Sequence, residues 1–444
     1  MEDDIMADIF AQKVRENSFK LCRVLKNKIN EMDSFPRWMP TFLRRPLQFF
    51  RDIFVKQKII VQLNDRYVSV LTAGDKKILG CKVDNRLNII NGFSTTVNMR
   101  KLKQLIIHES VAGVWVDRKV KAVLDVAAPV VGAPPVWQTG YEGKGVGIAI
   151  LDTGIYPHPD LTRPVNRIIA FKDFVNKKTQ PYDDNGHGTH CAGDAAGNGY
   201  ASNGKYRGPA PKANLIGVKV LDKKGSGLLS RVMAGVQWCM ENKRQYGIKV
   251  LSLSVGVKAT ESYKNDPLCL ALGKAWEAGL VVCAAAGNDG PDRQTINSPG
   301  ISPVIITVGA EDDRNTVRIS DDPVAGFSSR GPTVDGLEKP DLVAPGVNIV
   351  SLRSPCSYLD LRSRRARVGK HYLSMSGTSM ATPICAGVAA LLLESSPHLQ
   401  PDDVKKLLMD TCRKINYNPN AAGAGLIDAA AAIRRAGSPQ LERL

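Results

Sequence analysis

Several features are scarce or missing in this 444-residue sequence, and each absence excludes a class of protein. The nine cysteines are odd in number, follow no repeated spacing and include no CxxC pair, which argues against a disulfide framework and against a structural zinc site. No window approaches the roughly 18 uninterrupted apolar residues that a membrane-spanning helix needs. With 43% hydrophobic and 23% charged residues, the composition is instead that of a globular protein.

The basic balance of the chain, a net charge of +17, raises the question of a polyanionic partner. The charge is spread along the chain, and no basic run carries the interleaved aromatic residues of a nucleic-acid stacking platform. The densest cluster, LRSRRARVGK at 361–370, is predicted to be a solvated loop. We therefore expect no nucleic-acid partner, although a nucleic-acid-binding protein stays open as an alternative.

The first residues, MEDDIMADIF, contain early acids and no apolar core, so they do not resemble a secretory signal. Reduced cysteines agree with this interpretation. We expect a cytoplasmic protein without a membrane partner.

Hydrophobic patterning divides the chain into five parts. Residues 1–55 are predicted to be a basic helical extension, with Phe19, Cys22, Leu25 and Ile29 at helical spacing. Residues 56–125 combine β-rich segments (QKIIVQL, RYVSVLTA), a helix (MRKLKQLIIHE) and a pair of strands (VAGVWVDRKVKAVL), which indicates a small α+β unit. Residues 126–136, with APVVGAPP, are predicted to be an extended linker to a domain at 137–435, followed by a tail at 436–444.

The domain at 137–435 alternates continuous aliphatic strands with helices. The predicted strands include VGIAIL, ANLIGVKVL, IKVLSLSV, GLVVCAAAG and PVIITVGA. This alternation is typical of an α/β fold with a mainly parallel sheet and helices on both faces, in which ligands bind at the carboxyl ends of the strands.

Three motifs lie at predicted strand ends or helix starts: Asp152 in LDTGI, His187 in HGTHCAG and Ser379 in GTSMATP. A serine hydroxyl is a weak nucleophile unless an imidazole takes its proton, and the imidazole needs a carboxylate to fix its tautomer. Each residue has a simpler interpretation: Ser379 as a helix cap, Asp152 as a turn former, and His187 with His190 as metal ligands. Their joint occurrence, in the order Asp, His, Ser, favours nucleophilic catalysis.

These three motifs together resemble the subtilisin-like serine peptidases (subtilases) over residues 136–430, and the chain is most similar to bacterial cytoplasmic alkaline serine proteases with a long basic N-terminal extension. The resemblance implies a subtilisin-like fold and a serine endopeptidase that forms an acyl-enzyme on Ser379. It also assigns Asn288, in AAAGNDG, to the oxyanion hole beside the Ser379 amide; a left-handed turn residue is the alternative. A non-hydrolytic binding protein on the same scaffold is the rival interpretation.

The resemblance further implies two segments that bind an extended peptide between them, and hence broad specificity. Val257 replaces a glycine that is common in the family, and Asn297 is expected near the base of the primary pocket, so we predict a weaker preference for the largest aromatic side chains. Cys191 is predicted to be a small buried residue, with contact to the catalytic residues as the alternative. The residues of the two segments are Gly225, Ser226, Gly227, Ser254, Val255 and Gly256.

By the same resemblance, residues 56–125 form an inhibitor-like prosegment that the enzyme removes by cutting itself between about Leu124 and Pro135, so the chain is a zymogen. A permanently attached regulatory domain is the alternative. The chemistry implies no cofactor. Members of the family commonly bind a structural calcium ion, and Asp160 is the one ligand of such an ion that the sequence supports.

Overall fold

The computed structural model divides the chain into two compact units, residues 1–121 and 122–444. It describes residues 50–64, 77–87, 91–116, 124–314, 322–415 and 417–437, together with short stretches before residue 50 and at 66 and 316–317. Each unit is a body of its own with its own hydrophobic core.

The N-terminal unit contains an antiparallel sheet with the strand order β4-β5-β1-β6. Helix α4 begins after Asn98, whose side chain accepts a hydrogen bond from the Lys101 amide at 2.9 Å, and it buries Leu102 and Ile106. The described elements are η1 (Ser18–Lys20), β1 (Lys56–Leu63), β2 (Lys77–Ile78), β3 (Cys81–Lys82), β4 (Asn85–Leu87), β5 (Gly92–Asn98), α4 (Met99–Ile107) and β6 (Val111–Val116).

The predicted division of this region into an extension and an α+β unit needs revision. Leu25 and Ile29 are buried in the same core as β1 and α4, so this part of the extension belongs to the N-terminal unit. Phe19, predicted to share their apolar face, is 77% exposed. Of the predicted strand pair at 111–124, Val111–Val116 is a strand and residues 117–123 lie outside the described residues, as do residues 67–73 of RYVSVLTA.

The second unit contains a seven-stranded sheet in which every described pairing is parallel, with the strand order β15-β14-β12-β10-β7-β9-β8. Its central strands are buried along their whole length, which is why they appear in the sequence as continuous aliphatic runs. The strands are β7 (Gly147–Asp152), β8 (Ile168–Asp173), β9 (Asn214–Lys219), β10 (Ile248–Leu253), β12 (Val281–Ala285), β14 (Ile306–Glu311) and β15 (Leu342–Pro345).

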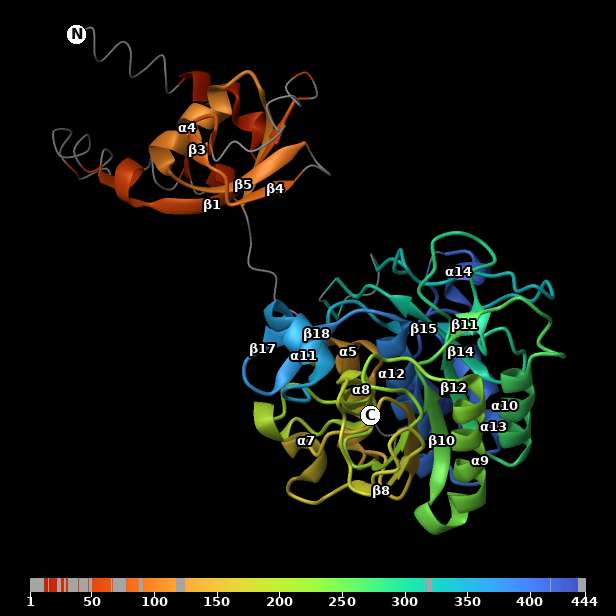
Figure 1. The fold of residues 1–444 in the computed structure, drawn as a ribbon. Helices are drawn as coiled ribbons and strands as arrows, with labels where there is room; N and C mark the ends of the chain where they lie inside the picture. The colour runs from red at the N-terminus through yellow and green to blue at the C-terminus, as the bar shows by residue number, and fades with distance from the viewer. Residues whose placement is uncertain are drawn as a thin grey trace, which may run out of the picture. The chain divides into compact units, whose positions relative to one another are not determined.

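Helices cover both faces of this sheet, as predicted: α9 and α10 on one face, α8 and α12 on the other (Figure 1). Helix α12 is long and apolar enough to cross a membrane, but 83% of it is buried inside the unit, as expected of a core helix. The remaining elements are α7 (Pro159–Thr162), α8 (His187–Ala196), η4 (Tyr200–Ser202), α9 (Leu229–Tyr246), β11 (Val257–Lys258), α10 (Pro267–Glu277), β13 (Asn297–Ser298), β16 (Ile349–Leu352), α11 (Tyr358–Arg362), η5 (Arg364–Ala366), β17 (Arg367–Val368), β18 (Tyr372–Met375), α12 (Thr378–Ser395), α13 (Pro401–Asp410), α14 (Pro419–Ala422) and α15 (Ala429–Arg435).

The predicted linker at 126–136 is not extended. It forms helices α5 (Leu124–Val130) and α6 (Ala133–Gln138), joined by Gly132 in a left-handed conformation. Two prolines that suggested a connector occupy the first turn of α6, where a missing N–H costs nothing. Because Val131 and Val136 are fully buried in the core of the second unit, this segment belongs to that unit.

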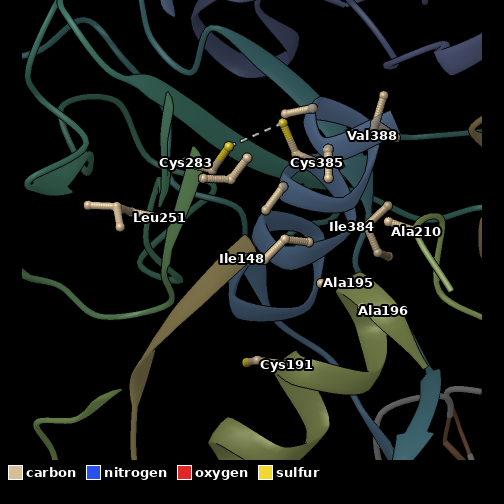
Figure 2. Packing of buried hydrophobic residues seen from close by; sticks show 14 of the residues in the cluster. Ile148, Cys191, Ala195, Ala196, Ala210, Leu251, Cys283, Ile384, Cys385 and Val388 are labelled. Atoms are coloured by element: carbon tan, nitrogen blue, oxygen red, sulfur yellow. Dashed lines mark hydrogen bonds between the residues drawn. The ribbon is translucent and has the colours of Figure 1, made fainter. Parts of the chain in front are cut away.

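Close packing of α8, α12 and the sheet fixes the positions of the helices that carry the site. Figure 2 shows Cys283 of β12 facing Cys385 of α12, with their sulfur atoms 3.9 Å apart. A Cβ atom at Gly387 of α12 would lie 2.6 Å from the carbonyl oxygen of Ala195 in α8. Only a glycine therefore lets the two helices approach this closely.

Candidate active site

Asp152 is the last residue of β7 and is completely buried. Its carboxylate oxygens lie 2.8 and 2.9 Å from the Nδ1 atom of His187, and the Thr153 amide donates to Oδ1 at 2.7 Å. The carboxylate therefore fixes the orientation of the imidazole and assigns the proton on Nδ1.

His187 is the first residue of α8, and its loop is held by residues that sequence analysis missed. Gly186 before it is left-handed (φ 106°), and a Cβ atom at Gly188 would lie 2.2 Å from the carbonyl oxygen of Gly154. Asp183, which is buried, accepts hydrogen bonds from the Gly186 amide and from the Thr153 hydroxyl. A buried carboxylate that satisfies a loop's own N–H groups has no motif that would reveal it in the sequence.

The imidazole of His187 titrates under two opposing influences. Burial lowers its pKa, but the carboxylate of Asp152 raises it, and the net pKa lies well above the ordinary value of 6.5. The side chain stays 19% exposed, so a substrate can reach its free nitrogen. The arrangement suits a general base, which accepts a proton once the pH exceeds this raised pKa.

Ser379 lies in the first turn of α12, beside the first turn of α8. Its carbonyl oxygen accepts hydrogen bonds from the Ser254 hydroxyl at 2.7 Å and from the Cys191 sulfur at 3.4 Å, and that sulfur lies 3.7 Å from Nδ1 of His187. The structure thus brings Asp152, His187 and Ser379 to one edge of the sheet. Within the described residues the Ser379 hydroxyl makes no hydrogen bond, and such contacts often tighten only when substrate binds.

Asn288 faces the same helix terminus. Its side-chain oxygen accepts hydrogen bonds from the Thr378 amide (2.9 Å) and the Thr378 hydroxyl (3.1 Å), which leaves the NH₂ group to donate elsewhere. The Ser379 amide has no partner among the described residues, as expected of a helix N-terminus. Two N–H groups that have no partner in the described part of the chain thus lie at the first turn of α12, which is the number of donors that an oxyanion hole uses.

The two predicted peptide-binding segments line one pocket of about 400 Å³. Its lining includes Gly225–Gly227 and Ser254–Gly256, and Leu221, Val257 and Leu268 add apolar surface. Val257 belongs to the wall, as the departure from the family pattern suggested.

Asn297 does not line this pocket. A Cβ atom at Gly256 would lie 3.3 Å from the Asn297 Cβ, and the Asn297 amide donates to the Asp289 carboxylate at 2.9 Å. A Cβ atom at Gly287, the residue before Asn288, would lie 2.6 Å from the Asn297 amide nitrogen. Asn297 therefore lies between a peptide-binding segment and Asn288, and its place at the base of the primary pocket stays a prediction.

Asp160 does not fit a calcium site. Its buried carboxylate accepts hydrogen bonds from the Tyr372 hydroxyl and the Ala201 amide, both at 2.8 Å. The guanidinium of Arg167 donates to the Asp160 carbonyl oxygen at 2.6 Å, and burial lowers the pKa of Arg167 to about 10, so it stays protonated at neutral pH. The Arg167 guanidinium already places a positive charge beside Asp160, and a calcium ion would have to displace that group.

The HGTH motif does not form a histidine metal pair. His190 is fully buried, with Nδ1 2.9 Å from Asp194 and Nε2 3.0 Å from the Leu373 carbonyl oxygen. Ligand atoms of Asp152, His187 and Cys191 do lie within 4.8 Å of one another. Burial raises the pKa of the Cys191 thiol to about 11, and Nδ1 of His187, the ring nitrogen beside this sulfur, already donates its proton to the Asp152 carboxylate at 2.8 Å and offers no lone pair to a metal ion.

Comparison with known proteins agrees with this geometry. Residues 143–425 match the model of the subtilase family, and the chain belongs to that family. It is a serine endopeptidase with a subtilisin-like fold.

Among its relatives, serine protease AprX of Bacillus subtilis (strain 168) is 48% identical over 431 residues, which cover 94% of this chain and 97% of that protein. Subtilisin E of the same organism is 32% identical over 391 residues, or 85% of this chain and 91% of the relative. The solved structure of S41 psychrophilic protease is 31% identical, has a TM-score of 0.54 and covers 65% of this chain and 92% of its own.

Proposed function

We propose that Asp152, His187 and Ser379 are the catalytic triad of this endopeptidase. His187 accepts the proton of the Ser379 hydroxyl at Nε2 as the oxygen attacks the peptide carbonyl, and it then donates the proton to the leaving amine. Water hydrolyses the resulting acyl-enzyme by the same steps in reverse. The observation that carries the proposal is the hydrogen bond of 2.8 Å between Asp152 and Nδ1 of His187, next to a first turn that presents Ser379.

The negative charge on the tetrahedral oxygen is stabilised by the Asn288 amide and the Ser379 backbone N–H. Because the Asn288 oxygen is already bound to Thr378, its NH₂ group is preorganised as a donor. Substrates are proteins and peptides that lie extended between residues 225–227 and 254–256. Main-chain hydrogen bonds dominate such binding, which supports broad specificity.

A fluorophosphonate probe and an activity assay test the triad together. The probe is expected to label Ser379 in the wild-type protein, and Ser379→Ala should lose the label and lower kcat by about 10⁴-fold or more without a change in melting temperature. Labelling at another residue, or a fully active Ser379→Ala variant, would refute the assignment. A folded wild-type protein that neither reacts with the probe nor cleaves peptides would favour the non-hydrolytic binding protein.

We further propose that the N-terminal unit is an inhibitory prosegment that the enzyme removes. The predicted cleavage window, Leu124 to Pro135, falls within helices α5 and α6, and proteases cut extended segments. The cut bond therefore belongs on the N-terminal side of Leu124. N-terminal sequencing should give a shortened wild-type chain and an intact Ser379→Ala chain; an intact wild-type chain supports a permanent regulatory domain, and a processed variant rules out self-cleavage.

A cytoplasmic location without membrane or nucleic-acid partners completes the proposal. The eight cysteines in the described part of the chain are free thiols, which suits a reducing compartment. Cell fractionation tests the location, and retention on DNA at low salt would contradict the absence of a nucleic-acid partner.

A further inference from the structure

The arginine-rich segment before Ser379 is an ordered module rather than a solvated loop. We refer to residues 353–371 as the arginine module; it contains α11, η5 and β17. The buried carboxylate of Asp360 holds it together by accepting hydrogen bonds from Nε of Arg353 (2.5 Å) and Nε of Arg367 (2.6 Å). Strand β17 also pairs with β18, which leads directly to α12 and Ser379.

The module binds to the loop that carries His187. The Tyr358 amide donates to the Asp184 carbonyl oxygen, and the Leu359 amide donates to that of Asn185, both at 2.9 Å. The Ser354 hydroxyl adds a third bond to the Asp183 carbonyl oxygen at 2.7 Å. Three consecutive carbonyl groups of the catalytic loop are therefore occupied by this one module.

The opposite contacts of that loop lead to the peptide-binding pocket. The Asn185 amide group donates to the Lys223 carbonyl oxygen at 2.9 Å, and a Cβ atom at Gly225 would lie 3.5 Å from the same amide nitrogen. Loop 183–187 thus separates the pocket wall from the arginine module, and the module contributes nothing to the pocket lining. In the proposed function this pocket takes residues that precede the cut bond, so the opposite side of loop 183–187, where the module lies, is the side assigned to the residues that follow it.

The charge on the module is largely uncompensated. Its single acidic residue, Asp360, is already paired with Arg353 and Arg367. Four further cations are exposed, and the Arg362 guanidinium packs 4.7 Å from the ring centre of Tyr358, the residue bound to Asp184. The Asp184 carboxylate is itself paired with Lys219 at 2.7 Å, so it does not neutralise them. The four exposed cations are Arg362, Arg364, Arg365 and Lys370.

We propose that the arginine module forms the leaving-group side of the cleft and selects substrates with Asp or Glu in the first three positions after the cut bond. This inference rests on the proposed function of His187 and Ser379. Exposed charge pairs contribute modestly one by one, but several guanidinium groups along one side of a cleft add to a field that favours acidic segments.

Two substrate types separate the inference from the proposed function. The first is a series of internally quenched peptides, identical up to the cut bond and carrying Asp, Ala or Lys in the second position after it. The second is an uncharged acetyl-peptide p-nitroanilide, which has no amino acid after the cut bond. Low salt should give a kcat/KM about tenfold higher for Asp than for Lys, and high salt should reduce the ratio by screening.

The combined variant Arg362→Gln, Arg364→Gln and Arg365→Gln should bring that ratio to within about twofold of one, while cleavage of the p-nitroanilide stays unchanged. The matched control removes three cations at the amino edge of the sheet (Arg244→Gln, Lys249→Gln, Lys274→Gln) and should keep the preference for Asp over Lys. It separates the effect of the charge on the module from the effect of the protein's net charge. A wild-type enzyme that cleaves the p-nitroanilide but shows no acidic preference overturns this inference and leaves the proposed function intact. No cleavage of either substrate type overturns the proposed function.

Discussion

The first turns of α8 and α12 differ from the bodies of the same helices. The first turns carry His187 and Ser379, which are both partly exposed, and the Ser379 amide has no partner among the described residues. The bodies are closely packed on each other and on the sheet, with glycine and alanine at the points of closest approach. The comparison suggests that chemistry and stability are divided along a single helix, so substitutions at the two ends should have separable effects.

The largest effect in a first turn, after loss of Ser379 itself, is expected from Asn288→Leu. The change removes one of the two proposed oxyanion donors and should lower kcat by about 10²–10³-fold with little change in KM, because the interaction exists mainly in the transition state. Steady-state kinetics on the p-nitroanilide measure both constants. An unchanged kcat would show that Asn288 acts only through its hydrogen bonds to Thr378.

In the helix bodies, Gly387→Ala should show the opposite pattern. The new methyl group would meet the Ala195 carbonyl oxygen at 2.6 Å, and overpacking of this kind destabilises a core by about 1–3 kcal/mol. Chemical denaturation should detect the loss, whereas kcat of the folded enzyme stays near the wild-type value. Gly273, where a Cβ atom meets nothing within 4 Å, provides the control Gly273→Ala. A large fall in kcat without loss of stability would contradict the division of roles.

The pH profile sharpens the comparison at His187. Burial lowers its pKa, but the carboxylate of Asp152 raises it above 6.5, and only the neutral imidazole accepts a proton. The value of kcat/KM should therefore fall tenfold per pH unit on the acid side, with the midpoint above pH 6.5. Asp152→Asn removes the charge that raises this pKa, so the midpoint of the remaining activity should move to lower pH. A wild-type midpoint at or below 6.5 would be inconsistent with the charge pair.

The smallest effect is expected at Cys191, where first turn and body meet. Its thiol contacts His187 and Ser379 but is protonated, so Cys191→Ala should change kcat by less than about threefold. A mercurial that reaches this sulfur should inhibit the wild-type enzyme and spare Cys191→Ala. The exposed Cys356 gives the control, since Cys356→Ser should remain sensitive; equal inhibition of both variants would place the reactive thiol elsewhere.

Sequence reasoning was most successful where a local pattern has a single physical meaning. Buried aliphatic runs predicted the parallel sheet, and Asp152, His187 and Ser379 were each placed at an element end. It failed where composition was ambiguous: prolines suggested an extended linker, although Pro134 and Pro135 fit the first turn of α6. Asp160 was assigned to calcium by its position in a motif, whereas its carboxylate accepts a hydrogen bond from Tyr372, which is distant in the sequence.

The sequence alone determined the class of chemistry, because only a few residue types can act as nucleophile, base and orienting acid, and each was flanked by its own short motif. Tertiary structure decided which groups are free to react. Asn288 keeps a free NH₂ group because Thr378 binds its oxygen, and the arginine module acquires its place because three loop carbonyls accept its donors. Which groups become hydrogen-bond partners depends on the distances between segments that lie far apart in the sequence, and no local motif specifies those distances.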